Sequence, residues 1–343
     1  MEKVMSRKLI TISTIMTLMS TSVIADVPNV AADIAPIHSL VSRVMDGVGA
    51  PKLIVQSGAS PHGYRLRPSE AKALQDADHV FWMGEELTPW LDSAIGTLAS
   101  KASVTTLLDQ QGVILHDFRE GALFEAHDHS AHGDDDHDDH KDHNDHDDHK
   151  DHDDHDDHDD HDDHKDHDDH DDHGSHDPHA WLSPENAKLW LNIIASKLSV
   201  SDPENAATYF MNAAAGQAEI EAMIAEVKAT LKPVQGGKFV VFHDAYQYFE
   251  NDFDFYASGA ISLGDSSDPS PARIEKVQKR IRDEGIQCVL AEPQFKKGLV
   301  ATVMEGSDAT ASVIDPLGAE LETGPKLYTR LIKNMAKTLR NCL

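Results

Sequence analysis

Cysteine is scarce in this chain, which contains only Cys288 and Cys342 among 343 residues. The two lie far apart and lack the C-x-x-C spacing of thiolate metal sites, so neither is expected to bind a metal. An H-E-x-x-H motif is absent as well, which removes the sequence signature of one large group of metalloproteases. Basic residues are also few: 30 Lys and Arg face 60 Asp and Glu, and no basic patch is present that could hold nucleic acid.

No apolar run reaches the ~20 residues that a membrane-spanning helix needs. The apolar run at residues 9–19 follows three basic residues and is interrupted by polar ones, and small residues precede Asp26. Residues 1–25 are therefore predicted to be a cleavable signal peptide and not a membrane anchor. No cysteine follows that could carry a lipid. We expect the mature chain to be free in the oxidising periplasm, where Cys288 and Cys342 would normally pair; the alternative is two separate buried thiols.

One segment carries most of the acidity. Residues 127–177 contain 25 Asp and 3 Lys, so they account for −22 of the net charge of −30. Residues 127–179 hold 18 of the 23 histidines, one at every third position from His137 onward. Because almost nothing in this insert is apolar, it cannot fold by itself. Imidazole and carboxylate at this density form a ligand set for zinc, copper or nickel, whereas an acidic tether would need no histidine.

The length of the chain exceeds what one hydrophobic core usually holds, so two lobes are expected. Apolar runs bounded by Gly, Pro and Asp alternate with longer amphipathic stretches, the pattern of α/β lobes with parallel sheets. Strands are predicted at 29–32, 52–56 and 79–84, and again at 238–242, 288–291 and 312–314. Helices are predicted at 67–76, 271–284 and 325–341.

A long helix is predicted between the two lobes. The stretch from Pro203 to about Leu231 is rich in Ala, Glu and Met, and Gly216 is its one internal glycine. This composition predicts a single rigid helix that ends near the following proline. The expected organisation is a Rossmann-like lobe at 26–202 that contains the insert, a linker helix at 203–233 and a second Rossmann-like lobe at 234–343. A ligand would bind in the cleft between the lobes, at the carboxyl ends of the strands.

Three histidines stand out because each follows a strand or precedes a helix: His62, His179 and His243. All three could therefore face one cleft. A single such histidine would more often be structural, but three of them in a chain with a metal-ligand insert favour a metal site. The remaining histidines have no comparable setting and are expected to be structural or at the surface: His38, His79 and His116.

Three motifs show a resemblance to a known family. They are F-H-D-A-Y-Q-Y-F-E at 242–250, A-E-P-Q-F at 291–295 and D-P-L-G at 315–318. In these motifs and along the whole mature chain, the sequence resembles the periplasmic zinc receptors among the metal-binding solute receptors of ATP-driven (ABC) importers. The resemblance implies two lobes joined by a long helix, a metal site between them, a disulfide between Cys288 and Cys342, a monomer, and an inner-membrane ABC permease as partner.

The resemblance also implies the ligands of that metal. His62, His179 and His243 occupy ligand positions, and Asp315 stands where manganese-binding relatives have a carboxylate. Three imidazoles suit zinc, whereas manganese favours carboxylate oxygens, so Zn²⁺ is the expected transported ligand. Some zinc-binding members have a glutamate before the first histidine, where this chain has Pro61. The fourth ligand is therefore open between Asp315 and water.

The expected function is that of a receptor that captures periplasmic zinc for the importer and is not an enzyme, with an insert that binds additional zinc weakly. A zinc buffer or metallochaperone is the main alternative. A zinc hydrolase is the second alternative, because three histidines and a water also make up catalytic zinc sites, yet no catalytic base is tied to the site by sequence. The insert could deliver, sense or store zinc. It could also close over the cleft as a lid, since its repeat is in phase with His179.

Overall fold

The computed structural model describes residues 27–119, 124, 176–262, 269–294 and 297–343. The predicted signal peptide and the insert up to residue 175 lie outside the described residues. Within the described part of the chain, no helix combines the length and the apolar composition that crossing a bilayer requires.

The N-terminal lobe is built on a sheet of four parallel strands in the order β2-β1-β3-β4. The strands are β1 (Val30–Ala32), β2 (Lys52–Leu53), β3 (His79–Trp82) and β4 (Ser103–Thr106). The helices that follow the first three strands are α1 (Ala35–Val44), α2 (Pro68–Gln75) and α3 (Pro89–Leu98). Each has proline in its first turn, where the fixed φ suits a helix start and the missing N–H is not needed. Helix α1 packs on one face of the sheet, and α2 and α3 pack on the other.

The C-terminal lobe repeats this topology, with four parallel strands in the order β6-β5-β7-β8. The strands are β5 (Phe239–His243), β6 (Ala260–Ser262), β7 (Cys288–Ala291) and β8 (Thr310–Val313). Its helices are α6 (Gln247–Phe253), α7 (Pro271–Glu284), α8 (Lys297–Met304) and α9 (Leu327–Cys342). Apolar residues of α7 and α8 cover one face of the sheet, and those of α6 and α9 cover the other. The α/β fold class with two parallel-sheet lobes is confirmed.

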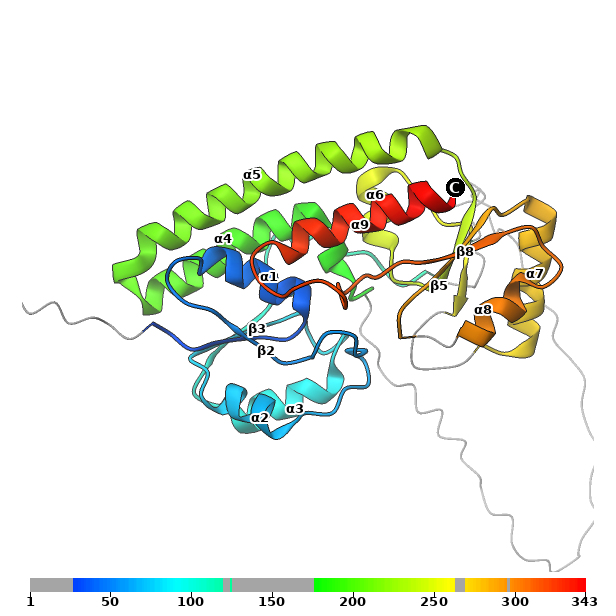
Figure 1. Ribbon diagram of the computed structural model, residues 1–343. Coiled ribbons are helices and arrows are strands. Elements are labelled where there is room, and N and C mark those ends of the chain that lie inside the picture. Colours follow the sequence, from blue (N-terminus) through cyan, green and yellow to red (C-terminus); the bar gives the residue numbers. More distant parts are fainter. Residues whose placement is uncertain (1–26, 120–123, 125–175, 263–268, 295–296) are drawn as a thin grey trace, which may run out of the picture.

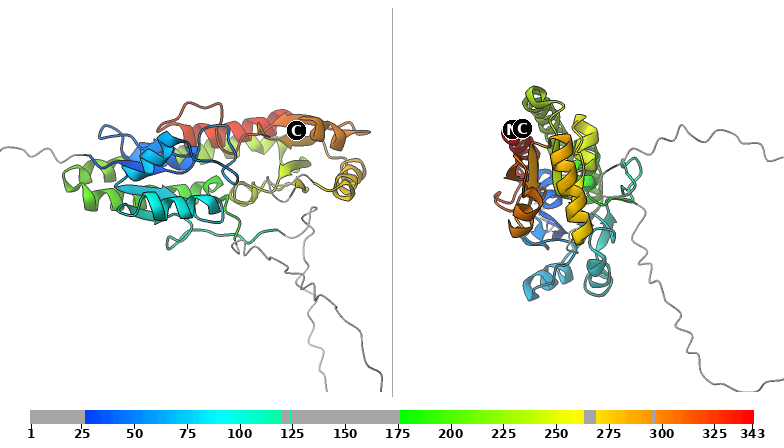
Figure 2. Two further views of the ribbon diagram at one scale, coloured as in Figure 1. Left: turned by 90° about the horizontal axis from the view of Figure 1, so that it is seen from below. Right: turned by 90° about the vertical axis from the view of Figure 1, so that its right-hand side faces the viewer.

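A long helix joins the lobes, which lie toward opposite ends of the molecule (Figures 1 and 2). After the insert the chain forms η2 (Ala180–Leu182), α4 (Pro184–Ser201), η3 (Pro203–Asn205), α5 (Ala206–Leu231) and η4 (Lys232–Val234). Helix α5 confirms the predicted linker helix, although Pro203 opens a short 3₁₀ turn and the α-helix itself begins at Ala206. At Gly216 a Cβ atom would lie 2.9 Å from Leu191 Cδ1. Glycine therefore lets α5 approach α4 closely.

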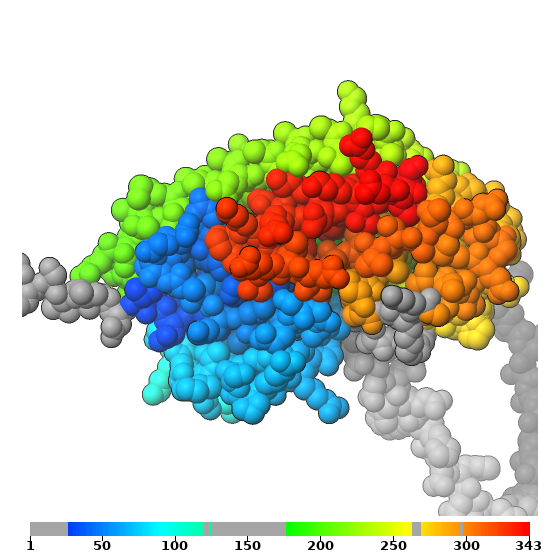
Figure 3. All heavy atoms as spheres, in the orientation of Figure 1, coloured from blue at the N-terminus to red at the C-terminus, as the bar shows by residue number. Residues whose placement is uncertain are grey.

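The C-terminal helix connects the two lobes a second time. Helix α9 packs against both α1 and α5, and the space-filling view shows it lying against α5 and the N-terminal lobe (Figure 3). One continuous buried apolar cluster includes residues of both sheets. A disulfide between Cys288 and Cys342 ties the end of α9 to β7, as predicted. Because core packing crosses between the lobes, the domain boundaries at 202, 233 and 234 remain a prediction.

Candidate metal site

The structure brings His62, His179 and His243 together. Each offers one ring nitrogen, and these atoms all lie within 4.8 Å of one another. Nε2 of His179 lies 3.4 Å from Nε2 of His243, and the ring of His62 lies 5.6 Å from that of His179 between centroids. His179 and His243 are buried, whereas His62 is half-buried. Three predicted site residues that are far apart in the sequence therefore converge on one point.

His243 is the last residue of β5, which is a central strand of the C-terminal sheet and its first strand in sequence. It is thus at the carboxyl end of a parallel strand, where α/β folds place their ligands. His62 comes from the loop after β2 in the other lobe. The indole Nε1 of Trp90 donates a 2.7 Å hydrogen bond to the carbonyl of Pro61, and Tyr64 packs on the same indole. These contacts hold the loop in place.

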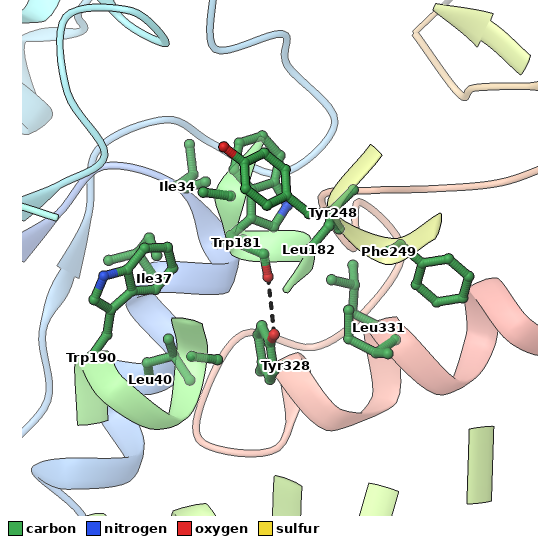
Figure 4. Close-up of a cluster of buried hydrophobic side chains, with 14 of the residues drawn as sticks. Ile34, Ile37, Leu40, Trp181, Leu182, Trp190, Tyr248, Phe249, Tyr328 and Leu331 are labelled. Atoms are coloured by element: carbon green, nitrogen blue, oxygen red, sulfur yellow. Dashed lines mark hydrogen bonds between the residues drawn. The ribbon is translucent and has the colours of Figure 1, made fainter. Parts of the chain in front are cut away.

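His179 directly precedes η2, whose side chains anchor it in the core (Figure 4). Trp181 and Leu182 are fully buried among side chains of both lobes. The hydroxyl of Tyr328 in α9 donates a 2.9 Å hydrogen bond to the carbonyl of Trp181, and the indole of Trp181 donates to the carbonyl of Pro316. His179 therefore stands on a rigid support although the insert precedes it.

Two buried carboxylates hold the imidazoles from behind. Nδ1 of His179 lies 2.6 Å from Asp177 Oδ1, and Nδ1 of His243 lies 2.5 Å from Glu292 Oε1. Both carboxylates are at most 2% exposed. If each Nδ1–H donates a hydrogen bond to its carboxylate, both Nε2 atoms present lone pairs to each other, and a shared cation would stabilise this arrangement. Sequence reasoning assigned no role to either carboxylate, although Asp177 lies two residues before a candidate ligand and Glu292 directly follows a buried strand.

The space enclosed at this point is small. A cavity of about 10 Å³ is lined by His62, His179, His243, Glu292, Gln294 and Leu317, together with Pro61, Trp181 and Pro316. A volume of about 10–15 Å³ on this measure holds roughly one water molecule. The site therefore has room for a single ion and not for an organic ligand.

Asp315 stands outside the histidine group. It follows β8, as His243 ends β5, but its carboxylate caps the turn that comes next. Oδ1 accepts hydrogen bonds from the backbone N–H groups of Leu317 and Gly318, and Oδ2 accepts one from Ala319. Gly318 has a φ of +75°, which glycine adopts without strain. The carboxylate thus already has three donors in the turn.

A second charged cluster lies beside His243. The guanidinium of Arg119 binds the carboxylates of Asp244 and Glu250. Burial raises the pKa of Asp244, and it raises the pKa of Glu250 to about 7, while the contacts with Arg119 act in the opposite direction on both. Arg119 therefore compensates two buried carboxylates next to the candidate metal site.

The three other histidines that lie outside the insert have structural surroundings. His38 Nε2 lies 3.2 Å from the carbonyl of Pro51, and burial lowers the pKa of His38. His79 Nε2 lies 2.6 Å from the hydroxyl of Ser201. His116 packs against Tyr248. None of them belongs to the group of potential metal ligands among the described residues, in agreement with the prediction.

Comparison with known proteins identifies relatives that are described as zinc-uptake components. A family model described as ZnuA, zinc-uptake complex component A periplasmic, matches residues 30–342. The high-affinity zinc uptake system protein ZnuA of Brucella abortus is 49% identical over 314 residues, which cover 92% of this chain and 91% of that protein.

Solved structures share the fold at lower identity. A crystal structure of ZnuA matches with a TM-score of 0.68 and 20% identity, covering 92% of this chain and 99% of its own. A structure titled as a ZnuA deletion mutant with zinc bound matches with a TM-score of 0.67 and 20% identity, covering 92% and 98%. The family match along nearly the whole described chain and the identity to the Brucella protein show that this chain belongs to the ZnuA family of periplasmic zinc-uptake components.

Proposed function

We propose that this protein is a periplasmic receptor that binds one Zn²⁺ between its lobes and delivers it to the permease of an ABC-type zinc importer. The convergence of His62, His179 and His243, two of them held from behind by buried carboxylates, is the observation that carries the proposal. The relatives named as zinc uptake proteins support it. We further propose that a signal peptide at 1–25 exports the chain and that the mature protein is a monomer without a membrane anchor.

The donor set favours zinc over manganese, because three imidazole nitrogens suit zinc and its neighbours. A tetrahedral zinc needs a fourth ligand. Water is favoured over Asp315, since the carboxylate of Asp315 accepts three backbone hydrogen bonds in its own turn. Zinc is therefore held by three histidines and one exchangeable ligand, which is compatible with later release.

A binding role is favoured over hydrolysis. A hydrolase needs a base positioned to activate the zinc-bound water, and the two carboxylates nearest the imidazoles, Asp177 and Glu292, each receive an Nδ1 contact. The space of about 10 Å³ among the histidines also favours a single ion over an organic substrate. Hydrolysis of a model ester by the zinc-loaded protein, abolished in His243→Ala, would be the result that favours the hydrolase.

We propose that the insert at 127–177, most of which lies outside the described residues, binds several further zinc ions weakly. Each ion must order a chain that does not fold by itself, which opposes tight binding. The bound ions would raise the local zinc concentration beside the cleft, and they would offset the insert's charge of −22. The solved ZnuA deletion mutant with zinc bound supports a site that is independent of an insert.

Growth under zinc limitation separates the receptor from a zinc buffer. A strain that lacks this gene is complemented with the parent, with a variant carrying His→Ala at positions 62, 179 and 243, or with a variant lacking residues 127–175, which keeps Asp177. A receptor predicts that the triple variant fails to restore growth, whereas the deletion variant restores it except at the lowest zinc concentration. Restoration by the triple variant together with failure of the deletion variant would favour the buffer.

A further inference from the structure

A short strap crosses from the N-terminal lobe to the C-terminal lobe beside the metal site. It consists of residues 113–119, which follow β4 and precede the insert. At its start, the backbone N–H of Ile114 donates to Asn186 Oδ1 at 2.8 Å, and Asn186 Nδ2 donates back to the carbonyl of Ile114 at 3.0 Å. Asn186 is a buried residue of α4. One end of the strap is thus fixed to the N-terminal lobe.

The other end of the strap is fixed to the C-terminal lobe by Arg119. Its Nε lies 3.0 Å from both carboxylate oxygens of Asp244, and its Nη1 lies 2.5 Å from Glu250 Oε2. The side chain of Arg119 is 16% exposed, against 7% for Asp244 and 1% for Glu250. The ring of Phe124 covers the guanidinium at 3.6 Å from its centroid. Planar, multidentate ion pairs that are shielded from water are among the stronger polar contacts in proteins.

Both partners of Arg119 are connected to the zinc ligands. Asp244 directly follows His243, and Glu250 lies in α6. In the same helix, the hydroxyl of Tyr248 accepts a hydrogen bond from the backbone N–H of His116 in the strap and donates one to the carbonyl of Asp177. Asp177 holds the ring of His179. The strap therefore meets, through one helix, the supports of two ligands that come from different parts of the chain.

We propose that Arg119 is a positioning residue of the zinc site: it latches the lobes together beside His243 and slows the release of zinc. The inference rests on the proposed zinc binding by His62, His179 and His243. Separation of the lobes would have to break a buried ion pair at this point.

Zinc dissociation into excess chelator, followed by stopped flow, tests the latch. Arg119→Met is expected to raise the dissociation rate roughly tenfold to a hundredfold, as when charge-assisted hydrogen bonds are lost. Arg119→Lys keeps the charge but loses the planar multidentate geometry, and an intermediate rate is expected. If Arg119 acted only through its charge, Arg119→Met would instead lower the dissociation rate, because removing a cation beside the site would favour bound Zn²⁺.

Two further variants keep the test decisive. Arg43→Met is the matched control, because Arg43 is also mostly buried, at 13% exposure, and binds Glu219 away from the site; its dissociation rate should equal that of the parent. The variant R119M/D244N/E250Q removes the whole charged cluster without leaving an unpaired buried carboxylate, so it should fold if Arg119→Met does not.

Folding is checked by thermal unfolding of the metal-free proteins. Release from folded Arg119→Lys and R119M/D244N/E250Q at the parental rate would overturn the latch and leave the zinc site intact. A parent that binds no zinc tightly would instead overturn the proposed function.

Discussion

At the scale of residues, two buried carboxylates contact imidazoles of the candidate site. Asp177 and Glu292 lie against the Nδ1 atoms of His179 and His243 and so orient the two rings. Asp177→Asn and Glu292→Gln are expected to weaken zinc binding roughly 10- to 100-fold, as removal of such partners does in other metal sites. A competition titration with a chromophoric chelator measures this change.

The matched control for these two variants is Asp202→Asn. Asp202 is equally buried and accepts a hydrogen bond from the hydroxyl of Tyr209, but it caps the start of η3, away from the histidines. Its zinc affinity should match that of the parent. Affinities of Asp177→Asn and Glu292→Gln that also match the parent would show that the two contacts do not tune the site.

The fourth ligand can be decided by comparing two substitutions. Asp315→Asn keeps one oxygen for the turn that this residue caps and removes the charge. If water completes the zinc coordination, its affinity should fall far less than that of His62→Ala, because only the histidine change removes a ligand. Equal losses in the same competition titration would identify Asp315 as a ligand.

Asp33 gives the fold a pH dependence. Burial raises the pKa of Asp33 to about 7, although the backbone N–H groups of Met83 and Ile34 donate to its carboxylate and favour the charged form. The folded state therefore holds this proton more tightly than the unfolded chain. Protonated Asp33 should therefore add its full contribution to the free energy of unfolding below about pH 4. This contribution should be lost as the pH rises to about 7.

Chemical unfolding of the metal-free protein at several pH values measures this slope. Asp33→Asn should flatten the decline in the free energy of unfolding between those two pH values, because its side chain does not titrate. An unchanged slope in Asp33→Asn would assign the pH dependence to other groups.

At the scale of elements, apolar runs predicted six of the eight strands in the described residues, and turn residues predicted several helix starts. β5 and β7, whose residues are almost all buried, were located to within one residue. Two strands were not predicted. β4 has the edge sequence Ser-Val-Thr-Thr with mostly exposed or half-buried side chains, and β6 has only three residues. Their pairing is set by neighbouring strands in the sheet, which local sequence does not reveal.

The same contrast applies to the site. The three histidines were identified from strand-to-helix transitions and family motifs. The contact of Glu292 with His243 joins residues 49 positions apart, and that of Arg119 with Glu250 joins residues 131 positions apart, so no local pattern marks these pairs. Asp177 is only two positions from His179, but the sequence does not show that its carboxylate is buried against the ring. The hydrogen bonds from backbone N–H groups to the carboxylate of Asp315 depend on the backbone geometry of residues 315–319, which the sequence does not show.

The disulfide stabilises the attachment of α9. It closes a loop over 54 positions between Cys288 and Cys342. In the chain-entropy model, the double variant C288S/C342S should lower the free energy of unfolding by roughly 4 kcal/mol. Urea unfolding of the two proteins without reductant measures the difference, and the parent in reductant should behave like the variant. Equal stabilities would show that packing of α9 on α1 and α5 suffices by itself.

At the scale of the whole molecule, two lobes with the same strand order present their strand ends to one narrow cavity. α5, α9 and a shared apolar cluster connect the lobes, so the fold itself holds the three histidines together. A preorganised site avoids the ordering entropy that the insert must lose when it wraps an ion. Tight binding is therefore expected from the three histidines and weak, multiple binding from residues 127–177.

The most direct test of this account is a zinc titration of four proteins by native mass spectrometry combined with chelator competition. The proteins are the parent, a variant lacking 127–175, which keeps Asp177 behind His179, the variant with His→Ala at 62, 179 and 243, and the combination of both changes. We expect the deletion to lower the number of bound ions while its tightest site keeps the parental affinity. The triple histidine variant should lose the tight site but keep the weak ions, and the combined variant should bind none. Loss of the tightest site in a folded deletion variant, or its persistence in the triple histidine variant, would contradict the account.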